Sequence, residues 1–352
     1  MRNSNTFLVI IAFFILSTAC SPETSTVEVV EYEGFQKKYE LNSVLVEWLD
    51  IRNCGDMRIY DSIMVVVDWK RAGGSIRVYN INSKKLIGAF GGFGKGPGEF
   101  FNPPHLTPMS SFMGKDLIIQ VYDNGRRIFQ NINLTKSIEG KEIIIISEFK
   151  VPDELRGLRS FITKDSILFS PNSSALHVYN YSTKESRDLH EPIELKQIFP
   201  SDQFENIARI MYLEMDAASQ RIVSCFNVMR RLHVYNADGD FLRVIKEKGS
   251  EIFNTGDKDI YANNKEHFTR TFLSDKYILV LDRDRLVGTA PPSNLSLFNP
   301  KGEALIHYKL DSWIFYGAVD WKTNILYTCD TQEARMISYS LKGINSEQLS
   351  KQ

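Results

Sequence analysis

The stretch Leu232-His233-Val234-Tyr235-Asn236 gives the clearest indication of the fold. Apolar and polar residues alternate in it, an aromatic residue follows, and the closing asparagine leads into a turn at 237–239. Strict alternation is typical of a β-strand with one buried face. Three similar copies stand at 76–80 (IRVYN), 176–180 (LHVYN) and 295–299 (LSLFN). A phrase that returns at long intervals predicts stacked units that share one core.

A second strand-like run precedes each copy and ends in a polar residue. Six such runs occur, at 63–68, 117–123, 167–170, 222–227, 278–282 and 325–330. The recurring phrase has two degenerate copies, at 127–131 and 336–340, so both series have the same number of members. Four strands in each ~40–50 residues are typical of a propeller blade. We therefore predict an all-β, six-bladed β-propeller with four-stranded antiparallel blades over residues 40–345. A β-sandwich is the main alternative, but it does not explain a sixfold repeat.

The sequence also predicts how the ring closes and how the chain ends. Residues 42–49 form a strand-like run before the first full unit, and we expect this run to pair with the last unit and close the ring. Helix is expected only in insertions, with 202–215 as the best candidate. Residues 346–352 are expected to be a C-terminal tail.

The N-terminus has the pattern of an export signal. Arg2 precedes an unbroken apolar run at 7–16, which is too short to span a bilayer but fits a signal peptide over 1–19. Small residues then lead to Cys20, and this resembles a bacterial lipobox, although Ser17 stands where leucine is usual. We expect lipidation at Cys20, followed by a polar tether over 20–39. A plain secretory signal cut nearby is the alternative.

Composition is that of an ordinary globular protein. The chain has 352 residues, is 43% hydrophobic, and has a net charge of −1, so no field of one sign favours nucleic acid. Three cysteines remain after Cys20, and an odd number cannot all pair. We expect Cys54, Cys225 and Cys329 to be small buried hydrophobic residues, while a bridge from Cys54 to either of the others stays open.

Two segments resemble a known propeller family. The segment 90–100 (FGGFGKGPGEF), followed by prolines at 103 and 104, resembles the turn between blades of NHL-type propellers. The segment 121–128 (VYDNGRRI) is similar to the strand-turn-strand core of that family. Together with the Cys20 signal, the whole chain resembles bacterial envelope lipoproteins of the NHL-type and TolB-like propeller class. The resemblance implies the fold, but that class includes both binding scaffolds and enzymes. The glycine-rich segment does not fit a phosphate-binding loop, because Gly96 follows Lys95 and the prolines oppose a helix.

Polar residues at the ends of the second strands are the candidate site. In a propeller the loops after these strands open on one face, around the central channel, so carboxylates and arginines would line its mouth and suit a polar ligand. The candidate ligand-binding residues are Asp68, Lys70, Arg71, Asp123, Arg126, Asn227, Arg230, Asp282, Arg283, Asp330 and Arg335. The alternative is that each aspartate caps the turn that follows it and pairs with a neighbouring arginine.

Metal and cofactor sites are not expected. His177 and His233 occupy equivalent positions in two units, which places them on different sheets and argues against a shared metal. No spacing typical of a catalytic or metal-binding motif occurs in the sequence.

The expected function is binding rather than catalysis. We predict an envelope lipoprotein, anchored by lipid at the outer membrane, that presents one ring of loops to a protein, peptide or glycan. The alternatives are a hydrolase or lyase at the channel mouth, and a structural subunit of an envelope complex. An enzyme needs a titratable pair with perturbed pKa values, a complex subunit needs a contiguous apolar patch, and a glycan binder needs exposed aromatic residues at the mouth.

Overall fold

The computed structural model describes most of the chain. The described residues are 27–51, 53–68, 74–96, 98–152, 159–162, 166–170, 177–180, 182–188, 211–216, 218–250, 265–286 and 288–344. The predicted signal peptide, Cys20 and the predicted C-terminal tail lie outside them.

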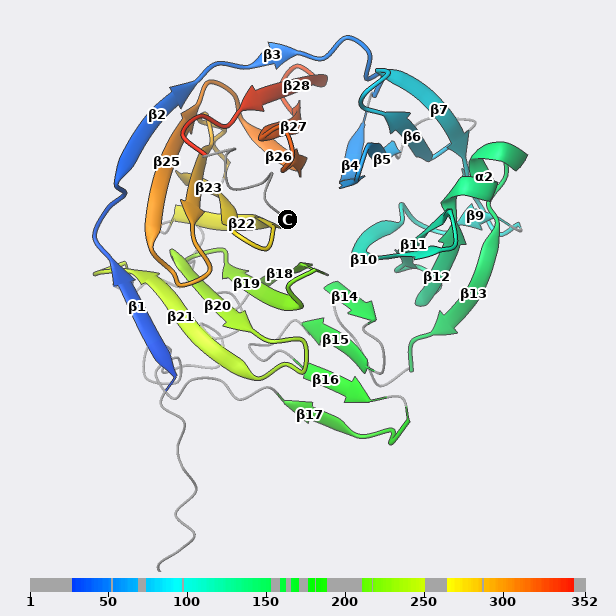
Figure 1. Ribbon diagram of the computed structural model, residues 1–352, viewed down its shortest axis with the longest axis horizontal. Coiled ribbons are helices and arrows are strands. Elements are labelled where there is room, and N and C mark those ends of the chain that lie inside the picture. Colours follow the sequence, from blue (N-terminus) through cyan, green and yellow to red (C-terminus); the bar gives the residue numbers. More distant parts are fainter. Residues whose placement is uncertain are drawn as a thin grey trace, which may run out of the picture.

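Six sheets of four or five strands lie around a common axis and follow one another in chain order (Figure 1). The first three, each from its innermost strand outwards, are β4 (Cys54–Tyr60), β5 (Ile63–Asp68), β6 (Ile76–Asn80), β7 (Lys85–Phe90); β10 (His105–Met113), β11 (Asp116–Asp123), β12 (Ile128–Asn133), β13 (Ile145–Lys150); and β14 (Arg159–Ile162), β15 (Ser166–Ser170), β16 (His177–Asn180), β17 (Ser186–Asp188). The other three begin with β18 (Met211–Asp216), β19 (Arg221–Phe226), β20 (Arg231–Tyr235), β21 (Phe241–Glu247); β22 (Lys265–Leu273), β23 (Ile278–Leu286), β24 (Asn294–Phe298), β25 (Ala304–Leu310); and β26 (Ile314–Asp320), β27 (Ile325–Asp330), β28 (Arg335–Ser340).

This arrangement is an all-β propeller, as the repeat predicts. Consecutive strands within each sheet are antiparallel, and the recurring phrase forms the third strand, for example β20 in the fourth sheet. The second strands are almost wholly buried, as in β5 and β11. Such strands are covered on both faces by neighbouring sheets, which explains their nearly continuous apolar sequences.

The hydrophobic core lies between neighbouring sheets. One cluster joins Val65 and Val78 of the first sheet to Leu106 and Ile119 of the second. Another joins Leu295 of the fifth sheet to the sixth sheet. In both clusters the apolar core is therefore shared between two neighbouring sheets.

A short N-terminal strand closes the ring. Strand β3 (Val44–Leu45) pairs antiparallel with β28, with Leu45 opposite Ile337. The backbone N–H and the hydroxyl of Ser43, just before it, donate to Asp311 Oδ2 at 2.9 and 3.0 Å. The predicted closure by residues 42–49 is confirmed.

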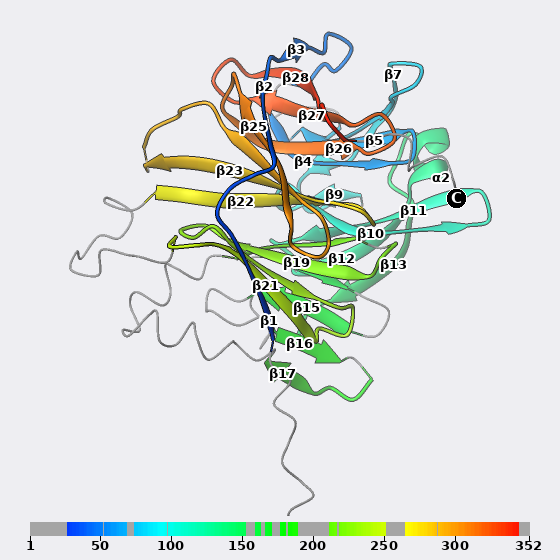
Figure 2. The same ribbon diagram turned by 60° about the vertical axis from the view of Figure 1, so that its left-hand side comes forward.

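The predicted tether over 20–39 is wrong in its second half. Strands β1 (Glu28–Tyr32) and β2 (Lys37–Leu41) run along the outside of the ring and pair in parallel with β21 and β25 (Figures 1 and 2). The fourth and fifth sheets thus have five strands, not four, and the added strand is parallel. The segment looked like a tether because its sequence is polar. Edge strands are often polar, since one of their faces carries charged side chains that stay in solvent.

Irregular elements account for the remaining described segments. Helix α2 (Leu134–Gly140) begins after Asn133, whose side chain accepts from Lys136 N, and it lies between β12 and β13. The helix predicted over 202–215 is wrong for residues 211–215, which lie in β18, and residues 202–210 lie outside the described part of the chain. The glycine-rich link between the first two sheets contains the parallel strands β8 (Gly92–Phe93) and β9 (Glu99–Phe100).

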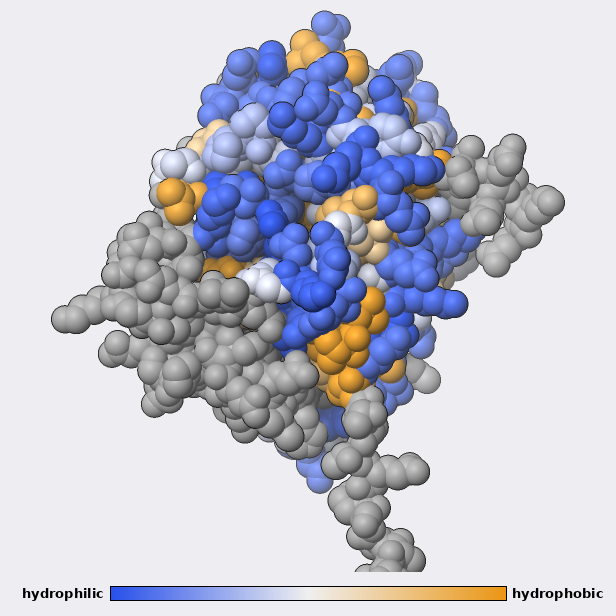
Figure 3. Space-filling model, turned by 90° about the vertical axis from the view of Figure 1, so that its left-hand side faces the viewer, coloured by the Kyte–Doolittle hydropathy of each residue, from blue (hydrophilic) through white to orange (hydrophobic). Residues whose placement is uncertain are grey.

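The outer surface is mostly hydrophilic. Figure 3 views the side that carries β1 and β2, and hydrophobic residues form only small patches on the described part of it. Exposed apolar side chains on the outermost strands include Val29, Val44, Leu86 and Leu242. Among the described helices, none is long and apolar enough to cross a membrane.

Candidate functional site

The aspartates predicted to line the channel mouth are buried at the ends of second strands. Asp68 Oδ1 accepts from the backbone N–H of Asn53 at 3.1 Å. The carboxylate of Asp123 accepts from the backbone N–H groups of Phe101 at 3.0 Å and Arg126 at 3.1 Å. The bonds from Asn53 and Phe101 hold the chain where it enters the first and second sheets. The bond from Arg126 is the turn capping that the sequence left as an alternative.

Asp330 has the same role in the sixth sheet. Its Oδ1 accepts from the backbone N–H of Gln332 at 3.0 Å, and Arg335 Nη2 lies 3.7 Å from Oδ2. Arg335 also pairs with Glu333 at 2.9 Å. Of the remaining candidates, Lys70 and Arg71 lie outside the described residues.

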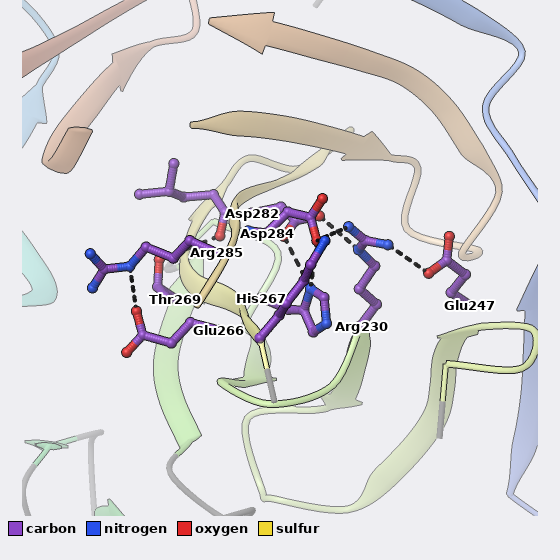
Figure 4. Close-up of polar contacts among 10 residues, drawn as sticks. Arg230, Glu247, Glu266, His267, Thr269, Asp282, Asp284 and Arg285 are labelled. Atoms are coloured by element: carbon purple, nitrogen blue, oxygen red, sulfur yellow. Dashed lines mark hydrogen bonds and ion pairs between the residues drawn. The ribbon is translucent and has the colours of Figure 1, made fainter. Parts of the chain in front are cut away.

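Arg230 is the only candidate arginine in the described residues that pairs with a candidate aspartate of another sheet. It stands in the turn between β19 and β20, and its Nε donates to Asp282 Oδ2 of the next sheet at 2.8 Å (Figure 4). Its other nitrogens lie 3.0 Å from Glu247 and 3.1 Å from Asp284. Burial raises the pKa of Asp282, but contacts with His267 and Arg230 outweigh this and hold the pKa below its ordinary value.

Arg283 belongs to a second group on the same sheet. Its Nη1 donates to Glu266 Oε2 at 3.2 Å, and its guanidinium carbon lies 4.0 Å from the ring centre of Phe315. Arg285 Nε donates to the same Glu266 oxygen at 2.6 Å and lies over Trp313. Strand β23 therefore continues beyond Asp282, where the sequence predicted its end.

The structure thus separates most of the predicted site. Among the candidates in the described part of the chain, only Arg230 and Asp282 pair with each other across two sheets, whereas Arg126 and Arg335 stay beside the aspartates of their own sheets. Asn227 is buried, and its backbone carbonyl accepts from His267 N at 2.6 Å.

A different charged group crosses the central channel. Arg58 of β4 and Glu214 of β18 come from opposite sides of the ring and form two parallel hydrogen bonds of 2.8 and 2.9 Å. Arg270 of β22 donates to Asp56 Oδ1 at 2.7 Å, and His105 Nδ1 lies 3.2 Å from Asp56 Oδ2. Innermost strands from three sheets therefore meet through ion pairs, and His105 brings in a fourth through its contact with Asp56.

The two arginines are firmly charged. Burial lowers the pKa of Arg58, but the Glu214 carboxylate outweighs burial and raises the pKa above its ordinary value. The same balance, with Asp56 as partner, raises the pKa of Arg270. Buried charges that are paired in this way hold a geometry well but are costly to leave alone.

A pocket lies beside this network. It has a volume of ≈ 190 Å³ and is lined by the innermost strands of five sheets. Its lining residues include the charged Arg58, Glu214 and Arg270 and the aromatic Tyr60 and Trp321.

The pocket lies at the opposite end of the channel from the predicted site. Its lining residues cluster where the first strands end, as Tyr60 does in β4 and Leu273 does in β22. The predicted residues stand where the second strands end, and the second strands run antiparallel to the first. Sequence reasoning missed the pocket because its charged pair joins residues 156 positions apart. A charged residue within a predicted strand, such as Arg58 in β4, was the only feature of the sequence that could have pointed to the pocket.

In the glycine-rich link, the Glu99 side chain accepts from a backbone N–H group of the link itself. Gly96 N donates to Glu99 Oε2 at 2.7 Å, and Gly94 N donates to the carbonyl of Phe100 at 3.0 Å. A carboxylate already occupies the place that an anion would take, in agreement with its interpretation as a crossing between sheets.

The two equivalent histidines and the three described cysteines lie within the sheets or are buried beside them. His233 is buried and accepts from Arg231 Nε at 2.8 Å, and His177 lies on a different sheet, as predicted. Cys54, Cys225 and Cys329 are buried and form no disulfide among the described residues. Within the described part of the chain, no three His, Cys, Asp or Glu side chains are grouped so as to hold a metal ion.

Comparison with known proteins supports the fold. No protein-family model and no curated protein matches the chain. A crystal structure of a DUF4221 family member from Bacteroides vulgatus is 13% identical with a TM-score of 0.55, over 87% of this chain and 99% of that one. A candidate exported protein from Bacteroides fragilis is 10% identical with a TM-score of 0.51, over 89% of this chain and 98% of that one. At such low identity these likenesses show the fold alone.

Proposed function

We propose that this chain is an envelope lipoprotein that binds a ligand in its central channel without transforming it. The observation that carries the proposal is the pocket beside the Arg58–Glu214 pair, at the centre of a rigid ring. Rigid elements position a binding site more precisely than loops do. A pocket that combines charged, hydroxyl and aromatic side chains suits one polar ligand.

Pairing of the carboxylates favours binding over catalysis. A general acid or base must be within reach of its substrate and free to exchange a proton at the working pH. Asp123 and Asp330 accept from backbone N–H groups, and Glu214 and Asp282 accept from arginines. For Asp282 the contacts with His267 and Arg230 hold the pKa below its ordinary value, which opposes proton exchange near neutral pH.

The binding proposal is tested by ligand-dependent stabilisation. We expect soluble extracts of bacterial envelope, fractionated by size, to raise the melting temperature of the protein, since a ligand of the folded state stabilises it by mass action. The bound compound should be recovered with unchanged mass after prolonged incubation. A compound that is converted during incubation would support the hydrolase or lyase alternative instead.

Lipid anchoring rests on the Cys20 pattern and agrees with the exported neighbour in fold. We expect the full chain to fractionate with membranes and a Cys20→Ala variant to remain in the aqueous fraction. Membrane association that is unchanged in the variant would contradict the anchor.

We also propose that each of the large sheets is one blade of a six-bladed ring of the NHL-type or TolB-like class. The support is the count of sheets with four or five strands, together with the six copies of the sequence repeat. A cryo-electron microscopy map with a different number of blades would contradict this proposal.

A further inference from the structure

Two cysteines lie at the seam where the ring closes, between the first and sixth sheets. Cys54 is the first residue of β4 in the first sheet, and Cys329 is the next-to-last residue of β27 in the sixth. Both belong to one buried hydrophobic cluster that joins these sheets, with Met57 on one side and Ala318 on the other. Two thiols that stand near opposite ends of the propeller sequence are therefore neighbours in space.

The two thiols are in direct contact. A side-chain hydrogen bond joins Cys54 and Cys329, and the backbone N–H of Cys54 also bonds to Cys329. A disulfide requires cysteines whose side chains point toward each other, and this contact meets that requirement. Each sulfur also donates to the carbonyl of the residue after it, at 3.4 and 3.6 Å. Thiols are weak donors, so loss of these two bonds opposes a new bond between the sulfur atoms very little.

The structure also decides between the two pairings that the sequence left open. Cys225 lies in β19 of the fourth sheet and packs in a different cluster, with Phe268 and Ile278 of the fifth sheet. The first and fourth sheets stand on opposite sides of the ring (Figure 1). A bridge from Cys54 to Cys225 would therefore break the fold, whereas a bridge to Cys329 fits it.

We propose that Cys54 and Cys329 form a disulfide when the chain folds in an oxidising compartment, and that this bond clasps the first sheet to the sixth. The step rests on the export proposed above, because disulfides form and persist mainly outside the cytoplasm. The oxidant is the disulfide of another molecule, either a small disulfide or a disulfide-exchange protein.

Thiol–disulfide exchange gives a balanced reaction. One cysteine loses its proton to water, and its thiolate attacks the oxidant, whose own S–S bond breaks and releases one thiolate. The second cysteine then loses its proton, attacks the protein sulfur of the mixed disulfide, and releases the other half of the oxidant as a thiolate. The chain gives up two electrons and two protons, and the disulfide of the oxidant is reduced to two thiols.

The bond would strengthen a seam that is otherwise held without covalent links. At this seam β3 pairs with β28, and the shared apolar cluster joins the two sheets. A disulfide stabilises mainly by restricting the unfolded chain, and the effect grows with the length of the closed loop. The loop closed here contains nearly the whole propeller. We therefore expect the oxidised protein to melt about 5–10 °C above the reduced protein.

Peptide mapping tests the bond directly. The full chain is purified in detergent, unfolded, and refolded with a mixture of reduced and oxidised glutathione. Free thiols are then blocked with N-ethylmaleimide, and the protein is digested with trypsin without reduction. The tryptic peptides that contain Cys54, Cys329 and Cys225 are 53–58, 323–335 and 222–230. We expect the first two peptides to be joined and the third to carry the blocking group.

Variants show whether the bond clasps the ring. Cys54→Ala and Cys329→Ala should each abolish the difference in melting temperature between oxidised and reduced protein, because one sulfur of the pair is gone. The matched control is Cys225→Ala, which removes a buried thiol from another sheet and should keep the difference. Comparison of the two redox forms of one variant separates the effect of the bond from the effect of lost packing.

The outcomes separate the disulfide from the proposals above. Blocked thiols at both Cys54 and Cys329 in the refolded wild type, or a link that includes Cys225, would overturn the disulfide. Equal melting of the linked and reduced wild type would overturn its role as a clasp. The same mapping on protein from the bacterial envelope should find the linked peptides, and free thiols there would overturn the proposal for the exported protein. A chain that forms the bond on refolding but stays in the cytoplasm would contradict export alone.

Discussion

Single residues of one type have different roles at the two ends of the channel. Asp282 and its counterparts in other sheets are buried at strand ends, where backbone N–H groups or an arginine bond to their carboxylates. Glu214 instead extends into the channel and meets Arg58 from the opposite side. The first kind of residue stabilises a turn, and the second kind shapes a pocket.

Acid should weaken the protein through Asp282. Its folded-state pKa is lowered, so its contribution to stability is present above the unfolded value of ~3.9 and is lost as pH falls through the folded value. We expect Asp282→Asn to be less stable than wild type at pH 7, and the difference should shrink as pH falls from 5 to 3. Urea midpoints at each pH measure this. Asp238→Asn, at an exposed position, is the control and should track wild type.

The Arg58–Glu214 pair should show strong coupling. Removing one partner leaves the other charge partly buried, and we expect Glu214→Gln or Arg58→Met to cost about 3 kcal/mol of unfolding free energy. The double variant Arg58→Met with Glu214→Gln should cost much less than the sum of the two single changes. A double-mutant cycle by denaturant unfolding gives the coupling free energy. Additive costs would show that the pair contributes little.

Among the elements, the N-terminal strands differ most from expectation. Glu28 and Glu31 of β1 face basic residues in register on β21, with Glu28 3.0 Å from Arg243 and Glu31 3.3 Å from Lys246. Tyr32, the last residue of β1, is buried, and its ring centre lies 5.1 Å from that of Phe298. An acidic segment thus becomes a strand because a basic edge is present to receive it.

Tyr32 should anchor this added strand. We expect Tyr32→Ala to cost about 3–5 kcal/mol of unfolding free energy, the usual range for loss of a buried aromatic side chain. Tyr32→Phe should be neutral or stabilising, because the buried hydroxyl has no partner among the described residues. Glu31→Ala should cost less than about 1 kcal/mol, since exposed ion pairs contribute little. Equal losses in all three variants would show that β1 is not anchored by its buried face.

At the scale of the whole molecule, closure of the ring depends on a few N-terminal residues. Strand β3 completes the sheet that ends with β28, and Asp311 binds both Ser43 and the hydroxyl of Tyr339 at 2.8 Å. Burial raises the pKa of Asp311, but the bonds from Ser43 and Tyr339 outweigh this and lower the pKa. The first and last parts of the propeller are therefore held together from both sides.

Removal of the closing strand should damage the whole ring. A protein that begins at residue 46 lacks β1, β2 and β3 and leaves three outer edges unpaired. We expect it to unfold at lower urea concentration, and its exposed edges should promote association. A protein that begins at residue 27 keeps these strands and is the control. Urea denaturation and light scattering after gel filtration compare the two, and equal behaviour would show that closure is dispensable.

The sequence by itself determined the repeat, and with it the propeller and the closing strand. Alternation in the third strand and apolar second strands are local properties, visible in a few consecutive residues such as 232–236. The turn-capping aspartates were also predictable as an alternative, because Asp123 and Arg126 meet within one turn.

Only the tertiary structure decided where the pocket lies and what lines it. Arg58, Glu214 and Thr271 come from three sheets and meet only when the ring has closed. The position of β1 likewise depends on a basic strand more than two hundred residues away along the chain, as the Lys248–Glu33 pair illustrates. Contacts of this kind depend on which sheets face one another. The sequence around one residue does not indicate which distant strand will lie beside it.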